Sequence, residues 1–526
     1  MKKTLSKDDN IRILYRIIII TLLIFTFLEC IFFPAWENIY GCGIFFLGWQ
    51  FLYNFVLKTD RTKCLFPFLA LLGLGISFFW LPLLATFLEG KPVTFRFENP
   101  YLTFNNQLLN LVMLICAYRI CYKVYRQKNP IFKLWNWMGY FKSPTDLQIW
   151  ILGFIGVASY IALLRIQGTD AAEAENLGWG GQILFVLRGF SVFPALLLFK
   201  KLYTGKDYQQ KHGIVFFYLG LLVIIGIGTG KRTLIFGPLV AMFMCYLIPA
   251  IVNNKKLFTT RNSILIIILV YLVTGPAADL AIAMAMGRDN HSQTSSLRTF
   301  SNITQLYGDR EKLHNMYQVY MSNFDNGGDN DFGWSEYYVD NIMLDRFCNL
   351  RVCDASLYYA KKLGYNNPIM QEYLYNQLLY LVPTPILNAF GYHFNKFEYS
   401  YTPGDLLSTE GLGLKSQYKG YRVAGDTGTG LYLWGYMYYI FALLIYFALF
   451  YFMSTRVKTG TTMIIPLPEL ATLYTILFTF NNATGIVGII KTLLRTGWQF
   501  IVVYCVIFLI VRKITFRYSK GYGKPS

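Results

Sequence analysis

The sequence predicts an all-α polytopic membrane protein with about twelve transmembrane helices and one large, mainly helical extracytoplasmic loop. Of its 526 residues, 55% are hydrophobic and 18% are aromatic, and the mean hydropathy is +0.38. Many apolar stretches exceed about 18 residues, which is enough to cross about 30 Å of hydrocarbon. A soluble domain cannot bury this much apolar surface, so we expect the chain to span a membrane repeatedly.

Apolar stretches bounded by polar loops predict the individual spans. They divide the chain into three regions: helices 1–9 in residues 1–286, a cap loop in residues 287–428, and helices 10–12 with a tail in residues 429–526. The expected spans are residues 12–33, 38–57, 65–88, 104–122, 148–165, 181–200, 213–229, 233–252, 263–286, 430–454, 464–482 and 496–512.

Basic residues gather in every second loop and in the tail, for example in KTDRTK, NNKKLFTTRN and RKITFRYSK. Lys and Arg near span ends stay in the cytoplasm. We therefore expect both termini inside and the long loop outside. The surplus of positive charge, +19 in total, lies mainly in the expected cytoplasmic loops. Membrane insertion explains this surplus, so we expect membrane lipids and no nucleic acid as partners.

The long loop contains helical patterns such as KLHNMYQVYMSNF and NPIMQEYLYNQLLYLV, separated by the breakers NGGDNDFG and LGYNNP. After Pro383 and Pro385 the loop becomes polar and rich in glycine. These patterns predict a small helical cap with polar ends. Cys348 and Cys353 point to different faces of a helix, so no disulfide is expected between them.

The segment GIGTGKRTLIFG, residues 226–237, places Lys231 and Arg232 between two apolar stretches. A P-loop would need glycine in place of Ile225 and Ser or Thr in place of Arg232. Glycines let backbone N–H groups approach an anion closely, so one interpretation is a turn that binds phosphate or diphosphate. The other is that both cations reach lipid headgroups.

Further cations are expected at the same face. Arg188 lies inside an apolar span, where a charge costs at least about 2.5–3.5 kcal/mol, so it needs a ligand or a partner such as Asp279. Lys491 and Arg495 share one helical face before the last span, and Arg298 follows the ninth span. Taken singly, each of these cations could simply anchor the chain at the membrane–water interface. Together with the GTGKR turn, they predict a cationic pocket for a polyisoprenyl diphosphate headgroup.

Several segments resemble the bacterial Wzy-type polymerases of lipid-linked oligosaccharide repeat units, which are relatives of the O-antigen ligases. LRGFSVFPALLLF resembles a family span with a basic residue, aromatics and a proline, and GTGKR is similar to a family turn. LVPTPIL and GDTGTGLYLWG are similar to the proline segment and the Gly-rich approach that end the family's long loop, and Arg495 matches a basic residue before the last span. One departure is NAFGYHFNKFEY, which stands where the family often has a basic residue and another proline.

The resemblance implies a GT-C-type glycosyltransferase of the bacterial cytoplasmic (inner) membrane that needs no metal and no cofactor. A glycan on polyisoprenyl diphosphate would be transferred to a hydroxyl of a new lipid-linked repeat unit, and the cations would stabilise the leaving diphosphate. The implied partners are the lipid-linked oligosaccharide, as donor and acceptor, a chain-length regulator and a flippase.

The acceptor hydroxyl needs a general base, and three residues are candidates. His393 follows the proline segment and has a suitable intrinsic pKa. Glu410 and Asp426 lie in the Gly-rich approach to the tenth span. Each of the three could equally be an ordinary surface or packing residue.

Arg346 and Arg351 are candidates for glycan binding, because they alternate with Asp345 and Asp354 at helical spacing. An intra-cap network of salt bridges is the alternative. Residues 329–331, DND, formally match the D-x-D metal motif of many glycosyltransferases. A turn rich in Gly, Asn and Asp explains them without an ion, so no metal site is expected.

Two other classes of protein remain open. A non-enzymatic translocator of lipid-linked saccharides would also offer about twelve spans and a cationic cavity, and an O-antigen-ligase-type transferase would use another acceptor. A translocator is expected to have short loops on both faces and two similar halves, whereas this chain has one dominant loop and no visible repeat. For a channel or a sensor, no filter-like or signalling segment is visible.

Overall fold

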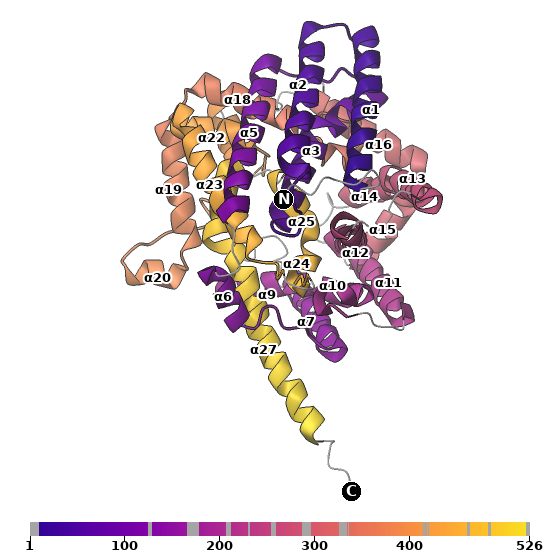
Figure 1. The fold of residues 1–526 in the computed structure, drawn as a ribbon, viewed down its shortest axis with the longest axis vertical. Helices are drawn as coiled ribbons and strands as arrows, with labels where there is room; N and C mark the ends of the chain where they lie inside the picture. The colour runs from indigo at the N-terminus through magenta and orange to yellow at the C-terminus, as the bar shows by residue number, and fades with distance from the viewer. Residues whose placement is uncertain are drawn as a thin grey trace.

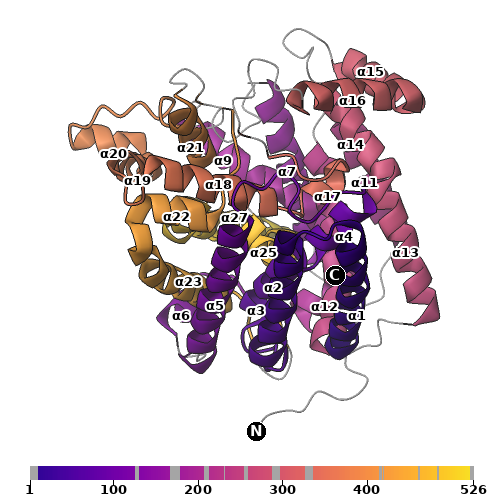
Figure 2. The same cartoon turned by 90° about the horizontal axis from the view of Figure 1, so that it is seen from above.

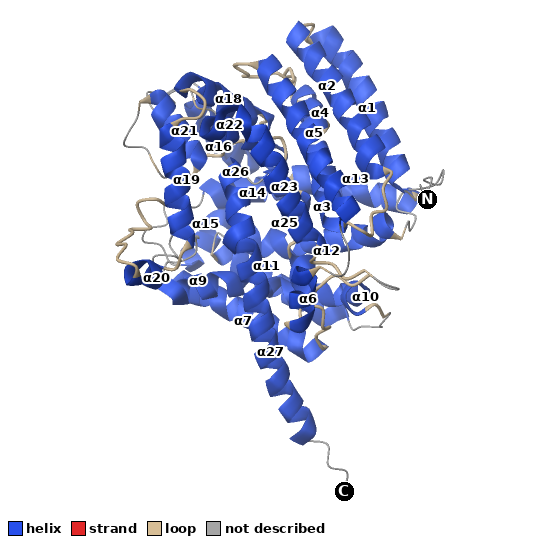
Figure 3. Cartoon of the chain, turned by 60° about the vertical axis from the view of Figure 1, so that its left-hand side comes forward, coloured by secondary structure: helices blue, strands red, loops and turns tan. Residues whose placement is uncertain are grey.

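The part of the chain that the structure describes consists of helices joined by loops and turns, with no β-strand there (Figure 3). The structure is a computed structural model. It describes residues 10–124, 129–165, 178–206, 212–229, 232–253, 259–286, 296–325, 334, 336–413, 418, 420–459, 463–481 and 485–521.

Ten helices in these residues are long and apolar enough to cross a membrane. This confirms an all-α protein with many apolar helices, although with ten long helices rather than the twelve spans expected. The ten candidates are Asn10–Phe32, Trp36–Leu57, Leu65–Leu88, Pro100–Val124, Asp146–Arg165, Gly180–Thr204, Thr233–Val252, Thr260–Met286, Asp426–Ser454 and Gly485–Thr515.

Two of the expected spans have a different form. The span expected at residues 213–229 is a shorter apolar helix, Gly213–Ile227. The span expected at residues 464–482 is broken into three pieces: α24 (Leu467–Ala471), α25 (Leu473–Leu477) and the 3₁₀ turn η4 (Thr479–Asn481). Prolines at 466 and 468 cannot donate to a preceding helical turn. The backbone angles of Thr472 and Phe478 are also not helical, with φ/ψ of −110°/13° and −104°/32°, so the helix is interrupted at both residues.

The N-terminal helices lie side by side in the turned view (Figure 2). Figures 1 and 2 also place α13 at the periphery, where its side chains are not buried against the protein. Its exposed apolar residues, such as Ile267 at 68%, suit contact with lipid.

The helices from the N-terminus to residue 286 have the following bounds: α1 (Asn10–Phe32), α2 (Trp36–Leu52), η1 (Tyr53–Leu57), α3 (Leu65–Phe79), α4 (Leu81–Leu88), α5 (Pro100–Val124), α6 (Pro130–Trp137), α7 (Asp146–Arg165), α9 (Gly178–Leu187), η2 (Arg188–Phe199), α10 (Lys200–Thr204), α11 (His212–Gly228), α12 (Arg232–Val252), α13 (Thr260–Thr274) and α14 (Pro276–Met286).

The long loop forms helices, as the sequence predicts, but one of them does not lie on the surface. Helix α18 is buried almost all round, although it is polar in composition. It packs against α5, against α21 and most extensively against α22. The loop helices are α15 (Ser296–Gly308), α16 (Arg310–Asp325), α17 (Ile342–Asp345), α18 (Leu350–Leu363), α19 (Pro368–Leu381), α20 (Thr384–Ala389) and α21 (Pro403–Leu412).

The C-terminal part begins with α22 (Asp426–Trp434), which leads through η3 (Gly435–Met437) into α23 (Tyr438–Ser454). After the broken segment, α26 (Gly485–Lys491) passes through a π-helical turn, η5 (Thr492–Thr496), into α27 (Gly497–Gly521). Helix α27 extends away from the body of the molecule toward the C-terminus (Figure 1).

A glycine allows α22 to lie directly on α18. A Cβ at Gly428 would meet the Cβ of Ser356 at 2.5 Å. We expect Gly428→Ala to lower the free energy of unfolding by about 1–3 kcal/mol, because the two helices would have to separate. Thermal melting of the purified protein measures this loss. Gly220→Ala in α11 is the matched control, since its Cβ would meet nothing within 4 Å, and an equal loss in that variant would contradict the explanation.

Candidate functional site

Several predicted site residues lie outside the described part of the chain. Lys231 and residues 329–331 are among them. Arg232 begins α12 and Arg298 lies in α15, but only their backbones are described. The GTGKR turn therefore stays a prediction in its side-chain detail.

Three cations from separate segments meet at Tyr380, in the last turn of α19. Lys396 donates a hydrogen bond from Nζ to the Tyr380 carbonyl oxygen (2.7 Å), and Arg495 reaches the same oxygen from Nη1 (3.4 Å). The Lys491 ammonium lies 5.0 Å from the centre of the Tyr380 ring, and that of Lys396 lies at 5.3 Å. Arg495 also donates from Nη2 to Gln182 Oε1 of α9 (2.8 Å). We call Lys396, Lys491 and Arg495 the Tyr380 cluster.

Local structure explains how these cations converge. The end of α19 carries partial negative charge on its unpaired carbonyls, which attracts cations. Lys491 ends α26, and Arg495 lies in the π-helical turn η5 directly after it. Single π-helical turns inside α-helices occur frequently at functional sites. The prediction that Lys491 and Arg495 share one site is therefore consistent with the structure.

Lys396 and Gln182 were not predicted from the sequence. Lys396 is 8% exposed and lies in the irregular loop between α20 and α21, where no periodicity indicates a face. The available signal was its position in NAFGYHFNKFEY, just after the proline segment. Gln182 lies in an apolar stretch and gave no signal.

Arg188 lies against an aromatic ring, and the partner considered for it is occupied elsewhere. Its guanidinium lies 3.6 Å from the centre of the Phe185 ring, so the ring shares the cost of its half-burial. Asp279, the partner considered for Arg188, instead pairs with Arg310 (3.2 Å) and approaches His314 (3.7 Å). Asp279 and His314 border a cavity of about 500 Å³ between α13, α14, α16 and α17.

Of the two predicted glycan-binding residues, Arg346 is exposed and Arg351 is 3% exposed. Arg351 forms a buried ion pair with Asp354 (2.9 Å). This geometry matches the alternative of a structural salt bridge. The network around it also includes residues outside the long loop. Asp354 also accepts three hydrogen bonds from the loop before α5 and its first turn: from Glu98 N (2.7 Å), Asn99 N (3.0 Å) and Thr103 Oγ1 (2.8 Å).

Two of the predicted bases lie in the segment expected to form the cap. His393 is exposed, in the loop that carries Lys396 three residues later. Glu410 is half-buried near the end of α21 and accepts a hydrogen bond from the Tyr418 hydroxyl (2.5 Å). Burial, reinforced by the neighbouring Glu410 carboxylate, raises the pKa of Tyr418 above its usual range. The Glu410 carboxylate therefore accepts its hydrogen bond from a Tyr418 hydroxyl that stays protonated.

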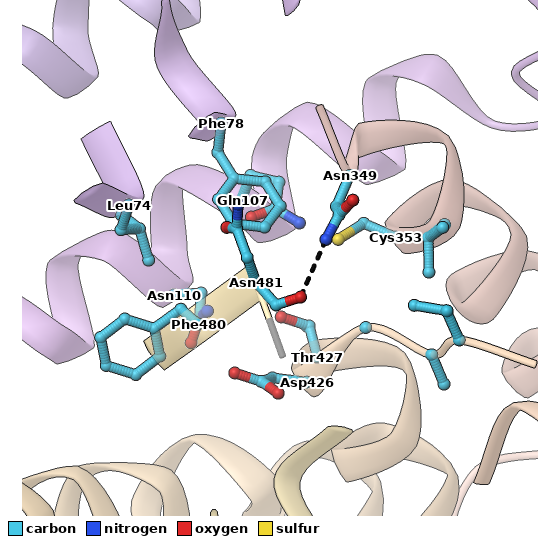
Figure 4. Close-up of a pocket in the computed structure, with 14 residues that line it drawn as sticks. Leu74, Phe78, Gln107, Asn110, Asn349, Cys353, Asp426, Thr427, Phe480 and Asn481 are labelled. Carbon is cyan, nitrogen blue, oxygen red and sulfur yellow. Dashed lines mark hydrogen bonds between the residues drawn. The ribbon is translucent and has the colours of Figure 1, made fainter. Parts of the chain in front are cut away.

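The third predicted base, Asp426, begins α22 and lines a small internal cavity of about 20 Å³ (Figure 4). Figure 4 shows Asp426 and Thr427 facing this cavity, with Asn110 and Asn481 on the other sides. Within the described part of the chain, the Asp426 carboxylate makes no hydrogen bond and no ion pair. The cavity lies between α3, α5, α18, α22 and the broken segment. It is lined by Leu74, Phe78, Gln107, Asn110, Asn349, Val352, Cys353, Val423, Ala424, Gly425, Asp426, Thr427, Phe480 and Asn481.

The structure thus brings two of the predicted cations together, at the Tyr380 cluster, and places Asp426 in a separate polar cavity. In the described residues, no three His, Cys, Asp or Glu side chains are grouped so that they could hold a metal ion. Comparisons with protein-family models, with curated proteins and with solved structures find no match to this chain.

Proposed function

We propose that this chain is a membrane glycosyltransferase that polymerises polyisoprenyl-diphosphate-linked oligosaccharide repeat units on the outer face of the cytoplasmic membrane. The observation that carries the proposal is the Tyr380 cluster, in which three cations from separate segments gather around one residue. The proposal rests on the site and on the family resemblance together.

The chemistry of the cluster suits a diphosphate leaving group. An Arg guanidinium matches two phosphate oxygens with parallel N–H groups, and Lys adds a compact charge. The cluster's contacts to the Tyr380 carbonyl, the Tyr380 ring and Gln182 hold the three cations in fixed orientations. Cations oriented in advance stabilise charge that develops on a leaving group.

A base must take the proton of the acceptor hydroxyl as the glycosidic bond forms. His393 is the candidate closest to the cluster in the sequence, three residues before Lys396, and its side chain is exposed. Its imidazole accepts the hydroxyl proton, while the diphosphate lipid leaves with the bonding electrons. Glu410 already accepts a hydrogen bond from Tyr418, which makes it a weaker base.

Disruption of the gene followed by sizing of the cell-surface glycan tests the proposal. We expect single repeat units to accumulate on lipid or on the final acceptor, because their transfer to one another would stop. Long chains that stay on lipid would indicate a ligase instead. Complete loss of outward-exposed intermediates would indicate a translocator and would overturn the proposal.

One observation favours the translocator as a second candidate. The segment from α24 to η4 is a discontinuous helix, and Asn481 at its end lines the polar cavity that holds Asp426. Broken helices beside a buried ionisable group are typical of secondary transporters. Uptake of labelled lipid-linked saccharide into vesicles that contain the purified protein separates the two candidates, since only a translocator moves the lipid without extending it.

A further inference from the structure

The cavity of Figure 4 contains a charge without a counter-charge. None of the fourteen residues that line it is Lys, Arg or His. Asp426 makes no ion pair within the described residues, and it belongs to a helix of membrane-spanning length. A carboxylate in such a place is costly unless something neutralises it. The N-terminus of α22 supplies only about half a positive charge.

Two further oxygens near this charge lack hydrogen bonds of standard geometry. Thr427 is 3% exposed, and its Oγ1, which faces the cavity, makes no hydrogen bond of standard geometry, although it interacts with the nearby Tyr438 hydroxyl. Asn481 Oδ1 is also buried without a partner. The main-chain oxygen of Asn481, at the end of η4, accepts from Asn349 Nδ2 (3.0 Å) and keeps a second lone pair. Unwound ends of broken helices offer such carbonyls to cations.

We infer that this cavity binds one monovalent cation, sodium, with Asp426 and Thr427 as side-chain ligands and the Asn481 carbonyl as a main-chain ligand. The inference is independent of the glycosyltransferase proposal. It assigns to Asp426 the role of an ion ligand rather than that of a general base.

The size and the charge of the site select this ion. About 20 Å³ admits a single particle of the size of a water molecule. Oxygen ligands select hard cations, and one carboxylate balances one positive charge, whereas a divalent ion would leave a surplus. A water molecule alone would satisfy hydrogen bonds but would not neutralise Asp426.

The other titratable groups that face Asp426 do not supply this charge. They are the Cys353 thiol of α18 and the hydroxyls of Tyr438 and Tyr446 in α23. These two hydroxyls bond to each other (3.0 Å), and Tyr446 also bonds to Asn110 Oδ1 (2.9 Å). All three groups are neutral when protonated, so none forms an ion pair with the carboxylate.

A bound ion would join two parts of the fold directly. Asp426 and Thr427 begin α22, which packs against α18, and Asn481 ends the broken segment. Sodium would therefore fix the loop helix α18, through its partner α22, to the broken segment. The expected signature is stabilisation of the whole chain by sodium.

Thermal melting of the purified full chain in detergent tests the inference, with sodium chloride compared with choline chloride at equal ionic strength. We expect sodium to raise the Tm of the wild type by about 2 °C or more in a saturable way. Binding of radioactive sodium should approach one ion per chain. In Asp426→Asn both effects should disappear, and in Thr427→Val the sodium concentration for half-saturation should rise several-fold.

Glu410→Gln is the matched control, because it also removes a half-buried carboxylate but should keep the sodium response of the wild type. If Asp426→Asn does not fold, the sodium concentration for half-saturation in Thr427→Val still tests the inference. The inference is overturned if sodium has no effect on the wild type, or if the response survives in Asp426→Asn. It is also overturned if the Tm depends on pH through Asp426 and sodium leaves that dependence unchanged, since the group that neutralises the carboxylate would then be a proton.

Discussion

Replacement of Arg495 by alanine is expected to reduce polymer formation about 100-fold or more, with repeat units accumulating on lipid. Arg495 joins α9 to the end of α19 through Gln182 and the Tyr380 carbonyl. The substitution thus removes the one guanidinium of the Tyr380 cluster and leaves two ammonium groups. Glycan sizing at matched protein levels measures the effect.

Two companion variants sharpen this experiment. Arg495→Lys keeps the charge but cannot make both hydrogen bonds, so we expect an activity between those of the wild type and Arg495→Ala. Lys361→Ala removes an exposed cation of α18 and should leave chain length unchanged. Wild-type chain lengths in Arg495→Ala would rule out the Tyr380 cluster as the diphosphate site.

The largest effect on stability is expected for Asp354→Ala, with a loss of about 3–5 kcal/mol in the free energy of unfolding. The substitution would leave the Arg351 guanidinium buried without its counter-charge, and Arg351 Nε already lacks a hydrogen-bond partner. Backbone N–H groups of residues 98 and 99 would also lose their acceptor. Thermal melting and the yield of folded protein in detergent measure the loss.

The double variant Arg351→Met/Asp354→Leu distinguishes an unpaired charge from lost packing. Because apolar residues can replace a buried ion pair at little cost, we expect it to recover part of the stability lost in Asp354→Ala. The exposed Glu372→Ala in α19 should stay within about 0.5 kcal/mol of the wild type. A double variant no more stable than Asp354→Ala would mean that the backbone hydrogen bonds of Asp354 dominate.

Hydropathy predicts most of the helices, because long apolar runs in this chain leave few alternatives to a helix in lipid. It predicts the broken segment poorly. Residues 464–482 have a suitable composition for a span, and Pro466 and Pro468 at their start are compatible with one. The second break, at Thr472, coincides with no proline or glycine, so no local signal in the sequence predicts it.

The candidate site was predictable where its residues follow one another closely in a helical segment. Lys491 and Arg495 are four residues apart, and they do meet at Tyr380, although Arg495 lies in the π-helical turn η5. Lys396 reaches the same point from an irregular loop, and no spacing rule relates it to residue 495. Arg351 shows the opposite case, since its charge favours a ligand site, whereas its nearly complete burial against Asp354 makes it a structural element.

The burial of α18 has a consequence for the order in which the protein matures. One of its neighbours, α5, is synthesised long before it, and another, α22, is synthesised after it. The segment around Asp354 therefore leaves the ribosome when α5 is already made but α22 is not, so α18 lacks its most extensive neighbour until the C-terminal helices arrive. Translation of the last hundred residues, rather than of the loop itself, completes the cap, so the loop is not a module that could be cut out or transplanted.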